Sequence, residues 1–200
     1  PASVQAQSTL SRVLDEQVLK VGLINDRHHY HLTGNGPTGF DYGYARGLAD
    51  YLGVTLQIEP FYSEEKLYQA LSNNTIHVAA PRFRPDALKP ELAYGPVLFT
   101  TTLLEIGPEN DAAPCAATEP RQRRVLPYIQ DFVTAITGSD WQKSEHIDSV
   151  TLLTELLSQA EFCTILPNTW RAALMGYFPY LNEQVLPDVT LSRQWLVRAE

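Results

Sequence analysis

The chain has 200 residues, of which 44% are hydrophobic and 19% are charged, and its formal net charge is −8 at pH 7. A globular chain of this length can bury one good core or two small ones. The acidic balance argues against a nucleic-acid partner, because binding to a phosphate backbone needs a basic stripe. No apolar stretch approaches the roughly 20 residues that a membrane-spanning helix requires. Since Pro1 is not a natural translation start, we expect any signal peptide or membrane anchor to precede it.

The first elements along the chain predict a β-α-β unit. A short lead-in helix is expected over residues 8–17, and residues 19–24 form an apolar run typical of a strand covered on both faces. The polar segment that follows is interpreted as a mobile loop. Ligands in open α/β sheets bind at the carboxyl ends of the strands, so this loop lies where a ligand is expected.

A glycine-bearing turn then starts a helix. Gly36 to Gly39 has the composition of a turn, and apolar residues three and four apart predict an amphipathic helix from Phe40 to Leu52. Gly53 is a typical helix terminator, and residues 54–58 alternate as a second strand.

The rest of the chain alternates between expected helices and strands. Helices are predicted over residues 63–71, 127–136, 149–157 and 168–175, and strands or extended segments over residues 76–80, 101–106, 162–166 and 189–197. The composition shift toward Pro, Ala and acidic residues over residues 108–120 indicates a boundary between two lobes.

The opening blocks resemble a known family. The sequence "LKVGLIND…GPTGFDYGYARGLADYLGVTLQIEP", over residues 19–60, is similar to the opening of family 3 periplasmic solute-binding proteins. The closest version is the N-terminal regulatory domain of membrane-bound lytic transglycosylase F. The likeness continues in the same order through residues 67–81, 94–107, 152–165 and 178–181, and so covers most of the chain.

The resemblance implies an α/β, two-lobed, periplasmic binding protein-like (type II) fold with two crossings between the lobes. Residues 1–18 form a lead-in segment, residues 19–102 and 190–200 form lobe 1, and residues 103–189 form lobe 2. The crossings are expected near residues 102–106 and 190–196.

Several residues are candidates for contact with a ligand. The charged pair Arg82 and Arg84 follows the strand at residues 76–80, at the ligand-bearing edge of the sheet, where an arginine can grip a carboxylate with two hydrogen bonds. The alternative is a solvated pair that balances Asp86 and Glu91. The full set of predicted ligand-binding residues is Asn25, Arg27, Tyr30, Phe40, Asp41, Arg82, Arg84 and Asn168.

Asp41 and the two histidines near it in the sequence also have interpretations that need no ligand. Asp41 lies in the first turn of the expected helix, where a carboxylate interacts favourably with the helix dipole, and the pocket role implied by the resemblance is the alternative. His29 and His31 could present two imidazoles on one side of an extended segment, but zinc needs at least one or two further ligands and no second cluster is offered. The alternative for these histidines is a solvated or ligand-contacting loop. We therefore expect no metal site and no cofactor.

The family's amino-acid clamp is missing at the aligned positions. Its arginine, which takes the α-carboxylate, corresponds to Leu88, and its aspartate, which takes the α-ammonium, corresponds to Pro167 with Asn168 beside it. A buried zwitterion without matched charges is costly. We therefore expect free α-amino acids to bind weakly or not at all.

The resemblance also implies a disulfide. In the family's second lobe the first and third strands are parallel neighbours, and Cys115 and Cys163 fall on the segments assigned to them. A periplasmic location would allow such a bond to persist.

The expected function is ligand sensing without catalysis, because no catalytic constellation is evident in this chain. The resemblance implies a regulatory domain in the periplasm, tethered to a membrane through the full-length protein, that responds to a small-molecule or peptide ligand such as a muropeptide. An attached or partner cell-wall enzyme, such as a lytic transglycosylase domain, is implied as well. The alternatives are an amino-acid or peptide transport binding protein and a degenerate fold that serves as a protein-interaction module.

Overall fold

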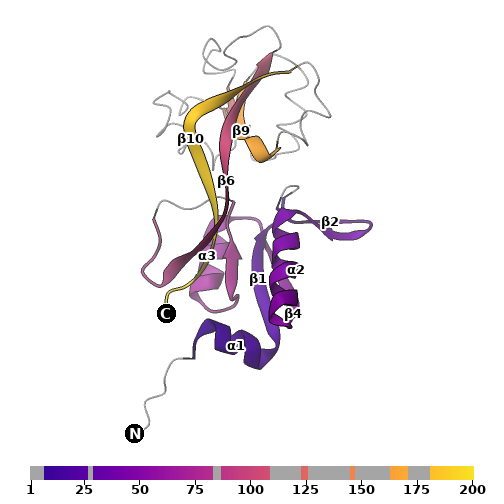
Figure 1. Cartoon of the computed structure of the whole chain (residues 1–200), viewed down its shortest axis with the longest axis vertical. Coiled ribbons are helices and arrows are strands. Elements are labelled where there is room, and N and C mark those ends of the chain that lie inside the picture. Colours follow the sequence, from indigo (N-terminus) through magenta and orange to yellow (C-terminus); the bar gives the residue numbers. More distant parts are fainter. Residues whose placement is uncertain are drawn as a thin grey trace. The chain divides into compact units, whose positions relative to one another are not determined.

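The computed structural model of the chain describes residues 7–26, 29–82, 87–108, 123–125, 145–146, 163–170 and 181–200. The chain divides into two compact units, one formed by Pro1–Phe99 with Ser192–Glu200 and the other by Thr100–Leu191. Two long strands, β6 (Leu92–Pro108) and β10 (Leu181–Arg198), contribute residues to both units (Figure 1). The chain therefore passes from one unit to the other within these strands.

The first unit is built on a sheet with the strand order β4-β1-β5-β10. Strand β1 (Val18–Ile24) pairs in parallel with β4 (Thr55–Phe61) and β5 (Val78–Ala80), and β10 runs antiparallel to β5. Beyond β10, the hydrogen-bonded strand order continues with β6 and then β9. Because β1 and β5 are parallel neighbours, their carboxyl ends lie at the same edge of the sheet.

Helices cover both faces of this sheet. On one face, Leu19, Val21 and Leu23 of β1 pack in a cluster with Ala45 and Ala49 of α2 (Phe40–Leu52). On the other face, buried residues from β1, α3 (Glu64–Ser72) and the loop before β5 form a second cluster that includes Ile24, Leu67, Leu71 and Ile76. The unit is thus a three-layer α/β/α structure, in agreement with the apolar run of β1, which is covered on both faces.

The helix boundaries follow from local capping. Helix α1 (Thr9–Glu16) begins at Ser8, whose side chain accepts a hydrogen bond from the backbone N–H of Ser11, and α3 begins at Ser63 in the same way. Helix α2 ends at Gly53, which has the left-handed φ of 67° that glycine adopts without cost. The three helices predicted in this part of the sequence are confirmed.

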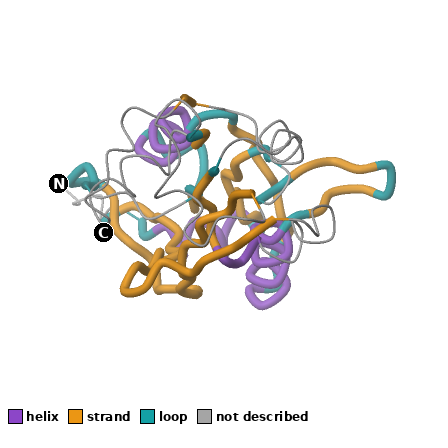
Figure 2. The backbone as a smooth tube through the Cα atoms, turned by 90° about the horizontal axis from the view of Figure 1, so that it is seen from above, coloured by secondary structure: helices purple, strands orange, loops and turns teal. Residues whose placement is uncertain are grey.

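The segment interpreted as a mobile loop contains a hairpin instead. Strands β2 (His31–Thr33) and β3 (Gly36–Thr38) pair in antiparallel register, and the hairpin projects from the unit (Figures 1 and 2). Leu32 is 70% exposed. Neither strand buries a face, so the sequence lacks the alternation by which a strand is recognised.

The described part of the second unit is a set of short strands. Strand β9 (Thr164–Pro167) pairs antiparallel with Leu103–Ile106 of β6, and β7 (Arg124–Val125) pairs in parallel with β8 (Glu145–His146). A single parallel bridge between Arg123 and Cys163 joins the two pairs. The helices predicted over residues 127–136 and 149–157 lie outside the described residues, and the one predicted from Asn168 begins as a 3-10 turn, Asn168–Trp170.

His77 predicts a pH dependence of stability. It is 2% exposed, and its Nδ1 accepts a hydrogen bond from the backbone N–H of Lys20 at 3.0 Å, so the imidazole is neutral. Burial, aided by the charge of Arg12, lowers the pKa of His77 below its ordinary value of 6.5. The unfolded chain therefore binds the proton more readily, and stability falls as the pH drops below about 6.5 toward the lowered pKa.

The His77→Asn variant keeps an acceptor near the position of Nδ1 and removes the titration. Chemical denaturation between about pH 7.5 and pH 5 should show a steeper loss of stability for the wild type than for this variant. Parallel curves would contradict the assignment of the neutral imidazole.

Candidate ligand-binding site

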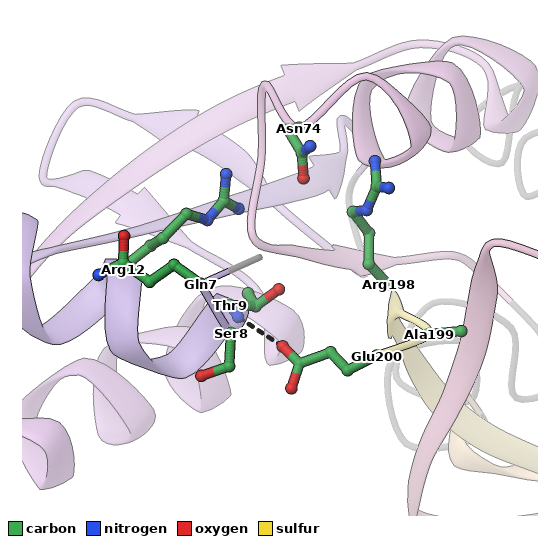
Figure 3. Close-up of a pocket in the computed structure, with 8 residues that line it drawn as sticks. All are labelled: Gln7, Ser8, Thr9, Arg12, Asn74, Arg198, Ala199 and Glu200. Atoms are coloured by element: carbon green, nitrogen blue, oxygen red, sulfur yellow. Dashed lines mark hydrogen bonds between the residues drawn. The ribbon is translucent and has the colours of Figure 1, made fainter. Parts of the chain in front are cut away.

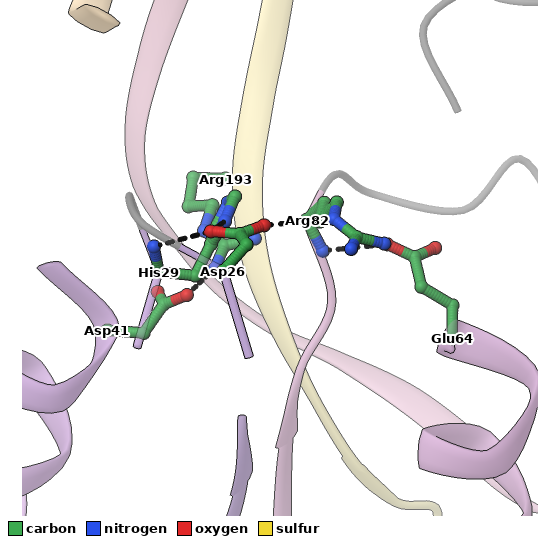
Figure 4. Close-up of polar contacts among 6 residues, drawn as sticks. All are labelled: Asp26, His29, Asp41, Glu64, Arg82 and Arg193. Atoms are coloured by element: carbon green, nitrogen blue, oxygen red, sulfur yellow. Dashed lines mark hydrogen bonds and ion pairs between the residues drawn. The ribbon is translucent and has the colours of Figure 1, made fainter. Parts of the chain in front are cut away.

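An ion pair lies at the carboxyl ends of β1 and β5. Asp26 follows β1 and Arg82 follows β5, and the Nε of Arg82 donates to Oδ2 of Asp26 at 3.1 Å (Figure 4). The side chains are only 12% and 15% exposed, respectively. Because the two strands are parallel neighbours, their ends bring together residues 56 positions apart in the sequence.

Asp26 is held on its other side by His29. The backbone N–H of His29 donates to Oδ1 of Asp26 at 2.9 Å, and the imidazole Nδ1 lies 2.6 Å from the same oxygen. Burial alone would raise the pKa of Asp26, but the hydrogen bonds and charge of His29, together with the charge of Arg82, hold this pKa well below its ordinary value of 3.8. The carboxylate is therefore ionised at neutral pH.

Helix α3 fixes the backbone of Arg82. The backbone N–H of Arg82 donates to Oε1 of Glu64 at 2.9 Å, and the hydroxyl of Tyr68 donates to Oε2 of Glu64 at 3.1 Å. Burial and the neighbouring Glu64 carboxylate raise the pKa of Tyr68, which keeps the phenol protonated. Glu64 thus links the first turn of α3 to the strand end that carries Arg82.

A second, fully buried ion pair joins α2 to β10. Asp41 is 0% exposed and accepts a hydrogen bond on Oδ2 from Nη2 of Arg193, which is 4% exposed (Figure 4). The backbone N–H of Asp41 donates to the carbonyl of His29 at 3.1 Å. Asp41 therefore lies in the first turn of α2, as predicted. Its ion pair with Arg193 is an additional interaction, separate from the interaction with the helix dipole.

The other predicted site residues of the first unit differ in exposure. Asn25 donates from Nδ2 to the hydroxyl of Tyr62 at 3.2 Å, and Tyr30 is buried with its ring 6.2 Å from that of Tyr42. Phe40 is 45% exposed, and its ring contacts those of Tyr44 and Phe99. Arg27 and Arg84 lie outside the described residues.

Asn168 belongs to the second unit. Its Nδ2 donates to the hydroxyl of Thr102 at 3.1 Å, and the backbone N–H of Thr169 donates to the hydroxyl of Thr101 at 3.3 Å. These contacts tie the 3-10 turn after β9 to the first residues of β6 in this unit. Asp26 contacts both Arg82 and His29, and the carbonyl of His29 accepts the backbone N–H of Asp41, so these predicted residues form one cluster. Asn168 belongs to the other unit.

Two contributors to the site were missed in the sequence. Arg193 alternates with Leu191 and Trp195, which are both buried, so a charged side chain on this buried face needs a partner. The sequence suggests His29 as a metal ligand or as part of a solvated or ligand-contacting loop, and it does not suggest its hydrogen bond with Asp26. Within the described residues, no group of three or more His, Cys, Asp or Glu side chains could hold a metal ion.

The predicted disulfide between Cys115 and Cys163 is not supported by this structure. Cys163 is a buried free cysteine, and Cys115 lies outside the described residues. Cys163 forms a parallel bridge with Arg123, and the backbone N–H of Arg124 donates to the carbonyl of Cys163.

A hollow of about 270 Å³ lies at the opposite edge of the sheet from Asp26 and Arg82. It is lined by the start of α1 and by the end of β10, and the backbone N–H of Thr9 donates to Oε1 of Glu200 within it (Figure 3). Ligands of open α/β sheets bind outside the carboxyl ends of the strands. The candidate site is therefore the cluster around Asp26 and Arg82 rather than this hollow.

Several curated proteins with similar sequences are membrane-bound lytic murein transglycosylases F. No family model matches the chain. Membrane-bound lytic murein transglycosylase F of Shewanella sp. (strain W3-18-1) is 27% identical over 187 residues, which is 90% of this chain and 39% of that protein. The protein of the same name from Aliivibrio fischeri is 31% identical over 140 residues, which is 69% of this chain and 27% of that protein. The chain thus spans well under half of the length of these relatives.

Several solved structures with a similar fold are amino-acid binding proteins. A truncated, arginine-bound ArgBP from T. maritima has a TM-score of 0.71 at 20% identity, covering 94% of this chain and 91% of that chain. A substrate-binding protein of an ABC uptake transporter from Streptococcus pneumoniae with bound histidine has a TM-score of 0.76 at 12% identity, covering 97% and 85%. In the part of the chain that the structure describes, no helix is long and apolar enough to span a membrane.

These comparisons confirm the predicted α/β fold and the predicted resemblance. The chain has the two-lobed fold of family 3 solute-binding proteins, and in sequence it is similar to part of membrane-bound lytic murein transglycosylase F.

Proposed function

We propose that this chain is a non-catalytic, periplasmic ligand-sensing domain of a lytic transglycosylase-like protein, and that its ligand is a cell-wall peptide fragment rather than a free amino acid. The fold of amino-acid binding proteins supports a ligand-binding role. The name shared by the curated relatives supports the link to murein. The relatives' own activity belongs to this proposal, since the chain spans only part of them.

The ion pair between Asp26 and Arg82 is the observation that carries the choice of ligand. Arg82 is the described arginine at the ligand-bearing edge of the sheet, and it already holds a carboxylate of the protein itself. Leu88 packs against the apolar cluster beneath α3, and Pro167 is buried within β9, so neither supplies a charge. A compact zwitterion would therefore have to be held without the two matched charges that its burial requires.

A peptide offers more points of attachment than a free amino acid. Its amide groups can exchange hydrogen bonds with polar side chains such as Asn25 and Tyr62, which already bond to each other in this structure. Each such bond adds a modest net contribution to the binding free energy. A ligand carboxylate that binds Arg82 must first break the bond between Arg82 and Asp26, so several such contributions are needed to offset that cost. The site therefore suits an extended ligand that carries a carboxylate and amides.

Calorimetric titration tests the proposal. We expect the common amino acids to bind no more tightly than about 1 mM, and a muropeptide with a short peptide stem to bind at about 1 μM, a difference of about 4 kcal/mol. A micromolar affinity for any free amino acid would contradict the choice of ligand.

The same ion pair favours a second candidate, a protein-interaction module without a small ligand. If no muropeptide and no amino acid binds or shifts the melting temperature, the site is closed by its own carboxylate, and this second candidate replaces the first.

A further inference from the structure

Asp26 presents to Arg82 the same chemical group that a carboxylate ligand would present. We propose that Asp26 is a specificity-determining residue, an internal carboxylate that a ligand must displace from Arg82. The site then rejects ligands whose main attachment is a single carboxylate, and admits those with further contacts. This inference rests on the proposed function, because it concerns the ligand of the same site.

The contacts of Asp26 make it a strong competitor. Its Oδ1 receives the backbone N–H of His29 and lies beside Nδ1 of the same residue, while Oδ2 receives Nε of Arg82. Hydrogen bonds that involve an ionised partner are roughly twice as strong as those between neutral groups. The lowered pKa of Asp26 means that this competitor stays charged wherever the protein is studied near neutral pH.

The backbone on both sides of the ion pair is fixed. The N–H of Arg82 is held by Glu64, and Asp26 donates to the carbonyl of Ile24 and accepts the N–H of Tyr30, both at 3.1 Å. The ion pair is therefore broken by rotation of one of the two side chains and not by a shift of the backbone. Rotation of the Asp26 side chain also removes its carboxylate from His29, so this displacement costs the contacts with both partners.

A peptide with a single charge isolates this effect. The probe is N-acetyl-trialanine, which has a free carboxylate and a blocked amine, and its C-terminal amide is the uncharged control. We expect wild-type protein to bind the two forms equally weakly. The Asp26→Asn variant should bind the acid at least tenfold more tightly than the wild type does, with the amide unchanged. Equal affinities of wild type and variant for the acid would overturn the inference.

Three further variants make the result specific. Asp50→Asn removes an exposed carboxylate of α2 and controls for the change in net charge, so it should leave the acid affinity unchanged. Asp26→Ser provides a second replacement of the competitor if the asparagine variant folds poorly, and should show the same gain. Adding Arg82→Leu to either Asp26 variant should abolish the gain, and its persistence would show that Arg82 is not the receptor.

The outcome separates this inference from the proposed function. If Asp26→Asn gains affinity for the acid while the wild type ignores muropeptides, the competitor exists and the proposed ligand is wrong. If the wild type binds a muropeptide and neither Asp26 variant gains affinity for the acid, the ligand stands and the competitor does not.

Discussion

Replacing Arg193 with leucine is expected to lower the free energy of unfolding by about 3–5 kcal/mol, because it leaves the carboxylate of Asp41 buried without its partner. Asp41 is fully buried, and its Oδ1 has no hydrogen-bond partner among the described residues, so the bond from Arg193 to Oδ2 is a large part of its stabilisation. A domain of ordinary stability, about 5–15 kcal/mol, would lose much of its margin. Urea denaturation followed by circular dichroism measures the loss.

Two control variants test whether the loss of stability comes from the buried ion pair. Arg46→Leu removes an exposed arginine from α2 and should change stability by no more than about 0.5 kcal/mol. The double variant Asp41→Leu with Arg193→Leu should recover much of the loss, since replacing both members of a buried pair by apolar residues is often neutral. If Arg193→Leu costs no more than Arg46→Leu, the buried pair does not stabilise the fold.

The second large effect is expected at Gly39, the residue before α2. Its φ of 120° and ψ of 157° fall in a region that only glycine occupies readily, and a Cβ there would lie 2.3 Å from the carbonyl oxygen of His29. That oxygen accepts the N–H of Asp41, so the clash is with fixed backbone. We expect Gly39→Ala to destabilise the protein by about 3 kcal/mol or more.

Gly47→Ala is the matched control within the same helix. A Cβ at Gly47 meets no atom within 4 Å, and alanine has the higher helix propensity. This variant should gain about 0.5–1 kcal/mol, with the opposite sign to Gly39→Ala. A Gly39→Ala variant that melts within one degree of the wild type would show that the loop at His29 yields without cost.

Local patterns were sufficient to predict the helices and the core strands of the first unit. Ser8, Ser63 and Gly53 are capping residues whose chemistry acts within one turn of the chain, so their positions in the sequence predict helix ends directly. The apolar run of β1 follows from burial on both faces. By contrast, the β2–β3 hairpin is exposed, so no burial pattern indicates it.

The partners within the site could not be predicted because they depend on topology. Arg82 forms an ion pair with Asp26, which the sequence did not suggest and which the parallel pairing of β1 and β5 brings to the same edge. Asp41 and Arg193 are 152 positions apart. The pattern around Arg193 does indicate burial, but the partner is known only once β10 is placed beneath α2.

The pair of Asp41 and Arg193 has a consequence for the descent of related sequences. Each residue alone is costly to lose while the other remains, and losing both is cheap, so the two positions are expected to be inherited together. A lineage in which the domain no longer needed a ligand would still have to pass through a destabilised single replacement to discard the pair. Asp41, in the first turn of α2, can therefore persist for structural reasons. An aspartate at this position in a distant relative would not indicate that the relative binds the same molecule.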